Sequence, residues 1–412
     1  MTGIKKNIAY MMLVQGVTYL APLVTLPYLT RVLGNETYGS FGFIQAIVQY
    51  FVLITDYGFG ITATRLIAIH RDDKKNISSV VANTIAVKLA LALVSAGVSV
   101  GLCILFPSIA QHDDVLLACF IGVLGNALFP TWMFQGLERM RALAVIICLS
   151  RLLPLPFFFV WVHRSSDVVT AAALQNIPGM IAAVFSFYYA WQQQLIRIAP
   201  VSLHQMKQML SEGWAVFLSN ISTSFYTTVN GILIGMFAGA EQAAFFYATD
   251  KLRLAAQGLI QPVASVFFPR VVVLHEQNDQ SSVSHMIKKG GMFLISMELI
   301  CGLVMFFGAD IIARHYLGAG FVPAALYLRS LAFLPVIIAV ATILSQWRFQ
   351  AVGQSVILSK IYLIAGPLHA LYASYLTYQF HTDGLIISLY VTEIGITAAM
   401  MIALKKKHIA VY

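Results

Sequence analysis

The stretch VVANTIAVKLALALVSAGVSVGLCILF, residues 80–106, contains a single charged side chain, Lys88. An α-helix needs about 20 mainly apolar residues to cross the hydrocarbon core of a bilayer. The stretch meets that requirement, so it predicts a membrane-spanning helix. Further runs of the same kind lie at residues 8–33, 39–62, 115–137, 143–162, 168–191, 213–238, 243–269, 290–313, 325–347, 355–378 and 384–404.

The composition agrees with this interpretation of the runs. Hydrophobic residues make up 59% of the 412 residues and charged residues only 10%, whereas a soluble globular protein carries about 25% charged residues. The chain has too little polar surface for a water-soluble enzyme, a secreted domain or a disordered scaffold. The sequence therefore predicts an all-α polytopic membrane protein with about 12 transmembrane helices.

Two short segments resemble each other at a separation of about half the chain. Residues 34–41 (GNETYGSF) follow the first run, and residues 239–246 (GAEQAAFF) follow the seventh; both carry Gly-x-Glu before an aromatic helix start. Such a repeat is typical of transporters built from two halves, with the substrate site at the repeat interface. We therefore expect two six-helix lobes, residues 1–200 and 201–412, around a central cavity.

The basic residues predict the orientation in the membrane. Lys and Arg concentrate in the loops on one side of the expected spans, and only Arg31, Arg164 and Arg314 lie in loops on the other side. Because cytoplasmic loops are enriched in these residues, we expect both termini in the cytoplasm. The net charge of +9 then reflects the topology in the membrane. Binding of nucleic acid would need a basic face on a soluble surface, and the sequence predicts no such surface.

Signatures of enzymes and metal sites are missing from the sequence. It contains no GxxxxGK[ST] phosphate loop and no HExxH motif, and its GxSxG match at residues 97–101 lies inside the apolar run 80–106. This argues against ATP-driven transport and hydrolysis. The ten His are scattered, and the four Cys lie in apolar runs without CxxC spacing. We therefore expect no catalytic residue, no metal and no cofactor, and a protein that is not an enzyme.

Charged side chains inside the predicted spans are the most informative residues. A charge at the bilayer centre costs about 2.5–3.5 kcal/mol on insertion scales. Such residues therefore usually line a pathway or pair with one another. The charges concerned are Asp56, Lys88, Arg151, Asp250, Lys251, Arg253, Glu298 and Glu393.

Some of these charges also have a simpler interpretation. Lys88, Arg151 and Glu298 lie within about two turns of a span end, from which a long side chain can reach the interface. Asp250 and Arg253 are three positions apart, a spacing at which they would pair on one helix face. Asp56 and Glu393 have no obvious local partner, which favours a role in a transport pathway.

The signs of the charges together suggest a class of cargo. Several cations around a cavity suit an anionic group such as a phosphate or diphosphate. Buried carboxylates beside them suit coupling to protons or sodium, because their protonation responds to burial and to neighbouring charge. The hypothesis from the residues alone is a sugar–diphosphate–lipid substrate that moves by alternating access.

Several motifs resemble those of one known family. They are residues 27–34 (PYLTRVLG), 57–60 (YGFG), 62–65 (TATR), 130–140 (PTWMFQGLERM), 257–259 (QGL) and 268–271 (FPRV). In order and spacing they are similar to Wzx-type O-antigen and polysaccharide repeat-unit flippases of the MOP superfamily. The stretch 130–140 is the most specific of these matches.

The resemblance implies a twelve-helix, two-lobe transporter in the bacterial inner membrane. Its cargo would be undecaprenyl-diphosphate-linked oligosaccharide repeat units, moved from the cytoplasmic to the periplasmic leaflet. The resemblance also places Arg31, Arg151, Arg253 and Arg270 among the basic residues of the family, and Asp56 at its acid before Tyr-Gly-Phe. The pair Asp250–Lys251 matches no family pattern.

The resulting candidate site has two groups of residues. The expected cationic cavity consists of Arg31, Lys88, Arg151, Lys251, Arg253 and Arg270, and the expected ion-coupling acids are Asp56, Asp250 and Glu393. Whether a proton gradient, a sodium gradient or the membrane potential drives the cycle stays open, and membrane lipids surround the protein. Contact with the separate polymerase and chain-length regulator stays open.

Two other functions fit the sequence less well than the flippase. An ion-coupled drug or metabolite antiporter of the same superfamily is disfavoured by the basic residues, because cationic drugs require acidic sites. A membrane-bound polysaccharide polymerase is disfavoured because such enzymes carry a large periplasmic loop, and the expected outer loops here are short.

Overall fold

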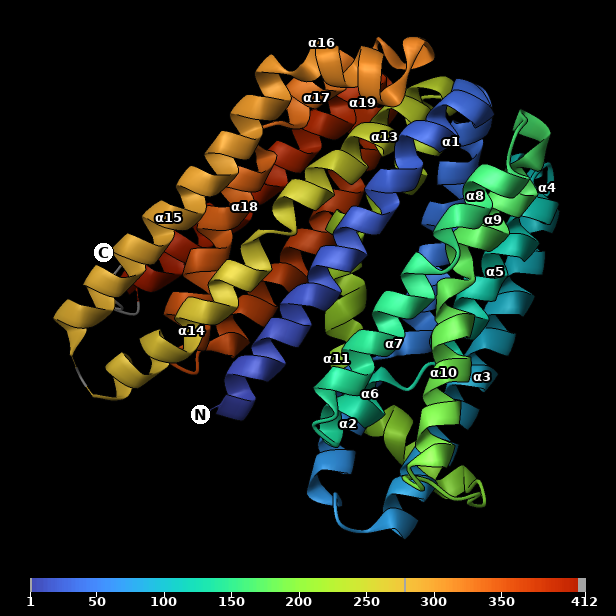
Figure 1. Ribbon diagram of the computed structural model, residues 1–412. Coiled ribbons are helices and arrows are strands. Elements are labelled where there is room, and N and C mark those ends of the chain that lie inside the picture. The colour runs from blue at the N-terminus through green and yellow to red at the C-terminus, as the bar shows by residue number, and fades with distance from the viewer. Residues whose placement is uncertain (1, 278, 407–412) are drawn as a thin grey trace. The chain divides into compact units, whose positions relative to one another are not determined.

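The computed structural model describes residues 2–277 and 279–406, with side chains from residue 10 onward. Within these ranges the chain forms helices and no strand, which confirms the all-α prediction (Figure 1). The predicted cytoplasmic position of the two ends concerns residue 1 and residues 407–412, which lie outside the described residues.

The described chain divides into two compact units. Unit 1 holds the described residues up to Thr25 together with Ser40–Ile221. Unit 2 holds Leu26–Gly39 together with the described residues from Ser222 onward. Compact units record which residues pack together, and the predicted lobes, residues 1–200 and 201–412, stay a prediction.

The helices follow the apolar runs, because a backbone in hydrocarbon must satisfy its hydrogen bonds internally. The first half of the chain forms α1 (Thr2–Asp56), α2 (Phe59–Ile69), α3 (Lys74–Leu105), α4 (Pro107–Ala110), α5 (Asp113–Leu128), α6 (Thr131–Gly136), α7 (Met140–Leu152), α8 (Leu155–Trp161), η1 (Ser165–Asp167), α9 (Val168–Asn176) and α10 (Pro178–Gln192).

The second half begins with α11 (Leu203–Thr227), in which the boundary between the two units falls. It continues with α12 (Val229–Phe237), α13 (Ala240–Gln257), α14 (Ile260–Glu276), α15 (Gln280–Phe307), α16 (Ala309–Ile311), η2 (Ile312–Leu317), η3 (Ala319–Phe321), α17 (Ala324–Leu331), α18 (Leu334–Thr342), η4 (Ile343–Gln350) and α19 (Ser355–Lys406). Segments η1 and η3 are 3₁₀ turns, whereas η2 and η4 are π-helical.

Nine segments of the described chain are long and apolar enough to cross a membrane. The longest, Tyr10–Ile69, would measure about 90 Å as one straight helix, against a hydrocarbon core of about 30 Å. Gly34 interrupts it with φ 72° and ψ 176°, and His381 interrupts Ser355–Lys406 with φ 52° and ψ −128°. Each of these two segments therefore contains more than one helix.

The nine candidate segments do not test the expected number of twelve transmembrane helices. It takes each interrupted segment as a single span, and the predicted run 213–238 is not among the nine. That run carries Ser222, Thr223, Ser224, Thr227 and Thr228, and hydroxyl side chains lower its hydropathy. Twelve spans therefore stay a prediction.

The two predicted repeat segments begin with the same backbone turn. Gly34 has φ 72° and ψ 176°, and Gly239 has φ 85° and ψ 164°. Residues with a Cβ rarely adopt such positive φ values. In each repeat, a glycine therefore separates one helix from the next, which gives the sequence similarity a physical basis.

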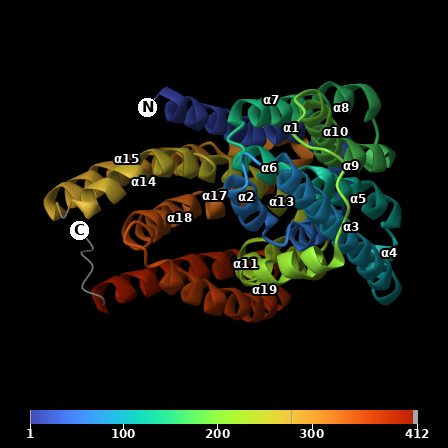
Figure 2. The same cartoon turned by 90° about the horizontal axis from the view of Figure 1, so that it is seen from below.

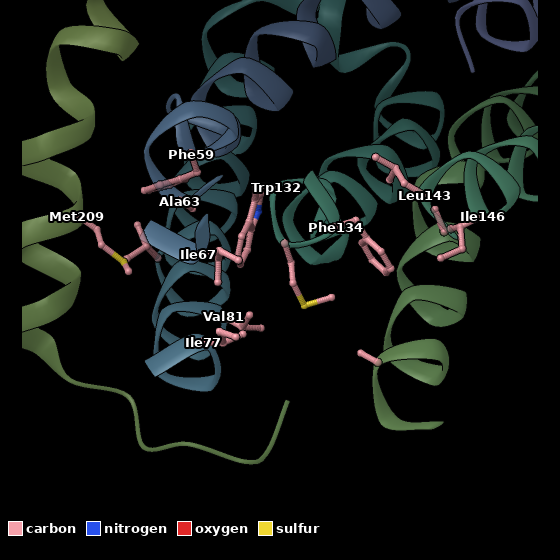
Figure 3. Close-up of a cluster of buried hydrophobic side chains, with 14 residues drawn as sticks. Phe59, Ala63, Ile67, Ile77, Val81, Trp132, Phe134, Leu143, Ile146 and Met209 are labelled. Atoms are coloured by element: carbon pink, nitrogen blue, oxygen red, sulfur yellow. The ribbon is translucent and has the colours of Figure 1, made fainter. Parts of the chain in front are cut away.

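A buried cluster of unit 1 joins α2, α3, α6, α7, α10 and α11. Its largest members include Phe59, Ile67, Trp132 and Phe134, all at most 1% exposed, and Figure 3 shows them in one cluster. Fully burying such a side chain contributes about 1.5–3 kcal/mol. The motif at residues 130–140 supplies Trp132 and Phe134, so its aromatic residues help to hold this cluster of unit 1 together.

Unit 2 contains two interrupted helices beside α15. Both views show α14 next to α15 (Figures 1 and 2), and α15 also packs against α17 and α18. Helix α13 stops at Gln257 before α14 starts at Ile260, and α17 stops at Leu331 before α18 starts at Leu334. At its own start α15 is capped by Asp279, whose carboxyl has its pKa lowered by hydrogen bonds from Ser282.

Candidate functional site

In unit 1 the structure pairs Asp56 with Lys88. Asp56 ends α1, and the next residue, Tyr57, turns the chain with φ 45° while its ring stacks on Phe217 at 4.6 Å between centroids. The Nζ atom of Lys88 lies 3.4 Å from Oδ1 of Asp56, and the two side chains are 2% and 46% exposed, respectively. A buried ammonium therefore has a half-exposed carboxylate as its counter-charge.

This pair corrects one expectation from the sequence. Lys88 does not extend to the membrane interface, because its side chain is enclosed by the protein. The partner of Asp56 is not local: it lies 32 positions further along the chain, on α3. The role of either residue in transport stays a prediction.

Arg151 occupies a small pocket of unit 1. It lies in the last turn of α7, where the helix dipole favours a cation. The pocket has a volume of about 60 Å³ and is lined by Arg151, Thr25 and Gln175 together with apolar side chains. It has room for a few water molecules and not for a sugar. Among the described residues Arg151 forms no ion pair, so it is a half-buried cation without a fixed counter-charge.

In unit 2 the charges of α13 form a local network. Arg253 is 8% exposed, its Nε lies 2.7 Å from Oδ1 of Asp250, and its Nη1 donates to Oε1 of Gln257 at 2.6 Å. The ion pair expected from the spacing of Asp250 and Arg253 is confirmed. These contacts fix the guanidinium group in one orientation.

Glu393 of α19 joins this network electrostatically. Its carboxyl interacts electrostatically with Arg253. It also interacts electrostatically with the hydroxyl groups of Tyr226, Tyr362 and Tyr372. The structure thus brings together three residues that the sequence singled out, on two helices of unit 2. Aromatic hydroxyls around an acid and an arginine can donate hydrogen bonds to an anionic or sugar-bearing ligand.

The other three predicted basic residues are not part of this group. Arg31 donates through Nη2 to the carbonyl oxygens of His315 and Tyr316, at the end of η2. The Nζ of Lys251 lies 5.3 Å from the centre of the Tyr38 ring, a cation–π contact. Arg270 is exposed and forms no ion pair within the described chain.

Two buried charged residues differ from the sequence prediction: Glu298 was expected at the membrane interface, and Arg348 was not among the predicted buried charges. Glu298 is 0% exposed, so the interpretation that it reaches the membrane interface is wrong. Arg348 follows the predicted run 325–347 and yet is 3% exposed, inside the π-helical segment η4. Within the described chain the carboxyl oxygens of Glu298 and the Nε and Nη2 of Arg348 have no hydrogen-bond partner.

A buried hydrogen-bond network around His369 in unit 2 was also not predicted from the sequence. The Nδ1 of His369 lies 2.5 Å from Oγ1 of Thr392, and its Nε2 lies 2.9 Å from Oδ1 of Asn230. Tyr372 hydrogen-bonds to the same Thr392. These residues lie on three distant parts of the sequence, so no local motif marks them. In the part of the chain that the structure describes, no three His, Cys, Asp or Glu side chains gather to hold a metal ion.

Comparison with known proteins identifies relatives over nearly the whole chain. The profile of a family described as "Polysaccharide biosynthesis protein" matches residues 4–275. A protein of Shigella dysenteriae named "Putative O-antigen transporter" is 34% identical, over 97% of this chain and 100% of its own length. A protein of Escherichia coli K12 with the same name is 30% identical, over 99% of this chain and 98% of its own length.

Solved structures with a similar fold are membrane transporters. An inward-facing multidrug resistance transporter of the MATE family, in the MOP superfamily, superposes with a TM-score of 0.72 at 15% identity, over 94% of this chain and 92% of its own. An outward-facing structure of the same family gives 0.62 at 17% identity, over 98% and 96%. At this identity the likeness concerns the fold alone. Together with the long apolar helices, the relatives identify a multi-pass membrane protein.

Proposed function

Because the chain belongs to the polysaccharide biosynthesis protein family, we propose that it is a flippase for lipid-linked oligosaccharides. It would move undecaprenyl-diphosphate-linked O-antigen or related repeat units from the inner to the outer leaflet of the bacterial inner membrane. The observation that carries this proposal is the near full-length likeness to two proteins named as O-antigen transporters. The MATE-like fold supports alternating access as the mechanism.

The cations of the membrane segments would bind the diphosphate of the cargo. Arg151 supports this role best, because its guanidinium lines a pocket and has no counter-charge in the described chain. Arg253 is held by Asp250 and Gln257, so it would present a guanidinium group that is already oriented. Planar guanidinium groups bind phosphate oxygens in a bidentate geometry.

The remaining basic residues would act in different ways. Lys88 is committed to Asp56, and Lys251 lies against Tyr38. Arg31 binds carbonyl oxygens at the end of η2, so its contribution would be to hold a turn. Arg270 is exposed and would meet the cargo or the lipid headgroups by long-range attraction.

Ion coupling would involve the acids paired with these cations. Protonation or sodium binding at Asp56, Asp250 or Glu393 would change the attraction that each exerts on Lys88 or Arg253. A change in these pairs alters the charge that the cargo meets, which links the ion gradient to the transport cycle. The basic residues on one side of the spans favour cytoplasmic termini.

The leaflet position of the lipid-linked units tests the proposed function. Right-side-out membrane vesicles from cells with and without the protein would be probed with a membrane-impermeant lectin. Depletion should trap the units in the inner leaflet while their total amount is maintained. Units that reach the outer leaflet but stay unpolymerised would contradict the flippase and favour a polymerase. Unchanged units together with altered drug tolerance would favour an antiporter.

A further inference from the structure

The carboxyl group of Glu298 lies inside unit 2 without a protein partner. The residue is 0% exposed, and among the described residues neither Oε1 nor Oε2 has a hydrogen-bond partner. Glu298 belongs to α15, one of the segments able to cross a membrane. Buried polar groups are nearly always hydrogen-bonded, so this exception calls for a specific explanation.

Protein, rather than lipid, encloses this carboxyl. Gly291, Leu294, Glu298 and Gly302 recur at helical spacing on the buried face of α15. A Cβ atom on Gly302 would come within 2.7 Å of the carbonyl oxygen of Ala332, and one on Gly291 within 3.2 Å of Ile343. This face therefore packs tightly against the segment that runs from the α17–α18 interruption to the start of η4. Glu298 lies between the two contacts along α15.

No cation is placed to neutralise an ionised Glu298. Of the elements packed against α15, α18 carries no titratable side chain. The others bring Arg253, which pairs with Asp250; Arg329, which pairs with Asp310; and Lys251, which lies over the Tyr38 ring. They also bring Arg270, His275 and Arg348, which form no ion pair in the described chain. On α15 itself the thiol of Cys301 interacts with Glu298, and Lys289 lies nine positions away, about 13 Å along the helix.

The surroundings favour the neutral acid. Apolar clusters lie before and after Glu298 along α15. One contains Leu294 and Ala339, and the other contains Met305 and Ala332. An unpaired carboxylate in such surroundings is strongly disfavoured, whereas a protonated carboxyl is tolerated. A sodium ion would need several oxygen ligands, and within the described chain Glu298 belongs to no group of three or more His, Cys, Asp or Glu side chains.

We propose that Glu298 is a proton-binding site that couples the transport cycle to proton movement. In the described conformation the carboxyl holds its proton. When the α17–α18 interruption at Ala332 and Phe333 moves, water reaches the group, the O–H bond breaks, and the proton passes to water while a carboxylate remains. Interrupted membrane helices are where transporters commonly bind coupling ions. The link to transport rests on the proposed flippase function, but the proton site itself does not.

Infrared difference spectroscopy tests the proton site without reference to transport. Purified full-length protein in lipid nanodiscs would be titrated, and the carbonyl band of protonated carboxylic acids would be followed. Glu298→Gln should remove a titrating component of this band. Glu276→Gln, the same change at an exposed glutamate that ends α14, should leave that component in place. A spectrum of Glu298→Gln identical to that of the wild type would overturn the proposal.

Transport in proteoliposomes tests the coupling. A pH gradient across the membrane should accelerate flipping by the wild type, and Glu298→Gln should lose that acceleration. If the Gln variant does not fold, Glu298→Met, an apolar side chain of similar length, should replace it and give the same loss. A full pH response in the substituted protein, or a response of the wild type to sodium alone, would overturn the coupling. A wild type that flips no lipid-linked unit would contradict the proposed function instead, with the infrared result unaffected.

Discussion

The ion pair of unit 1 and the ion pair of unit 2 are built in different ways. In unit 1, Lys88 on α3 meets Asp56 at the end of α1, across 32 positions of sequence. In unit 2, Asp250 lies one turn before Arg253 on α13, and Gln257, one turn after it, adds a second contact. The first pair depends on how two helices pack, whereas the second is a property of one helix.

The two pairs also differ in how many partners the buried cation has. Lys88 is 2% exposed and relies on one half-exposed carboxylate at 3.4 Å. Arg253 is 9% exposed at its side chain but keeps Gln257 if Asp250 is lost. Removing the acid should therefore destabilise unit 1 more than unit 2, and should affect transport more directly in unit 2.

The largest expected effect is that of Asp56→Asn. It leaves the Lys88 ammonium buried without a counter-charge, which should lower the free energy of unfolding by about 2–3 kcal/mol, less than for a fully buried pair because Asp56 is half exposed. Thermal unfolding of the purified protein in detergent would measure the change. The matched variant Asp56→Asn with Lys88→Met removes both charges and should recover most of the loss.

A double variant no more stable than Asp56→Asn alone would contradict the role given to Lys88. The parallel change in unit 2, Asp250→Asn, should cost less than Asp56→Asn, because Arg253 keeps its hydrogen bond to Gln257. Equal losses for the two substitutions would remove the contrast between the units.

The next effect is on transport, at Arg253. If its guanidinium binds the diphosphate, Arg253→Ala removes a charge-assisted hydrogen bond worth about 1.5–3 kcal/mol, which is roughly a ten- to hundredfold loss of affinity. Surface O-antigen and flipping in proteoliposomes would report it at equal protein levels. Arg253→Lys keeps the positive charge but loses the bidentate geometry of the guanidinium group, so it should retain part of the activity. Wild-type export by Arg253→Ala would remove this residue from the site.

A smaller effect is expected at Arg151, the unpaired cation of unit 1. Arg151→Ala should reduce export by about tenfold, near the lower end of the range for a charged hydrogen bond. Because Arg151 has no ion pair in the described chain, stability should change little. Arg164→Ala, at the exposed residue that precedes η1, is the matched control and should export normally. A stability loss without an export defect would make Arg151 a packing residue.

The smallest effect is expected at the exposed pair of Arg329 and Asp310, whose side chains are 38% and 69% exposed. Arg329→Gln should change the free energy of unfolding by about 0.5 kcal/mol, since exposed ion pairs contribute little. The shift in thermal midpoint should shrink further at high salt, because salt screens surface charge. A loss as large as that of Asp56→Asn would show that exposure does not rank these pairs.

Local features of the fold and the site could be predicted from the sequence. The length and composition of the apolar runs give the all-α class, and the three-residue spacing gives the Asp250–Arg253 pair. The shared Gly-x-Glu motif marks Gly34 and Gly239, which adopt the same positive-φ turn. In each case the cause lies within a few residues of the pattern.

Features that depend on packing between helices could not be predicted in this way. The partner of Asp56 requires α1 and α3 to be side by side, and no periodicity reports this. Glu298 occupies an apolar run, and the run alone does not say whether lipid or protein surrounds the side chain. The contacts of His369 join α12 to two parts of α19. Such sites become visible only when the tertiary contacts are known.

Reconstituted transport tests the central claim most directly. Purified protein in liposomes would be supplied with undecaprenyl-diphosphate-linked repeat units on one side, and a membrane-impermeant lectin or glycosidase would report their appearance on the other. The account predicts translocation that exceeds that of protein-free liposomes and falls in Arg253→Ala. Translocation no faster than in protein-free liposomes, with correctly folded protein and a gradient present, would contradict it.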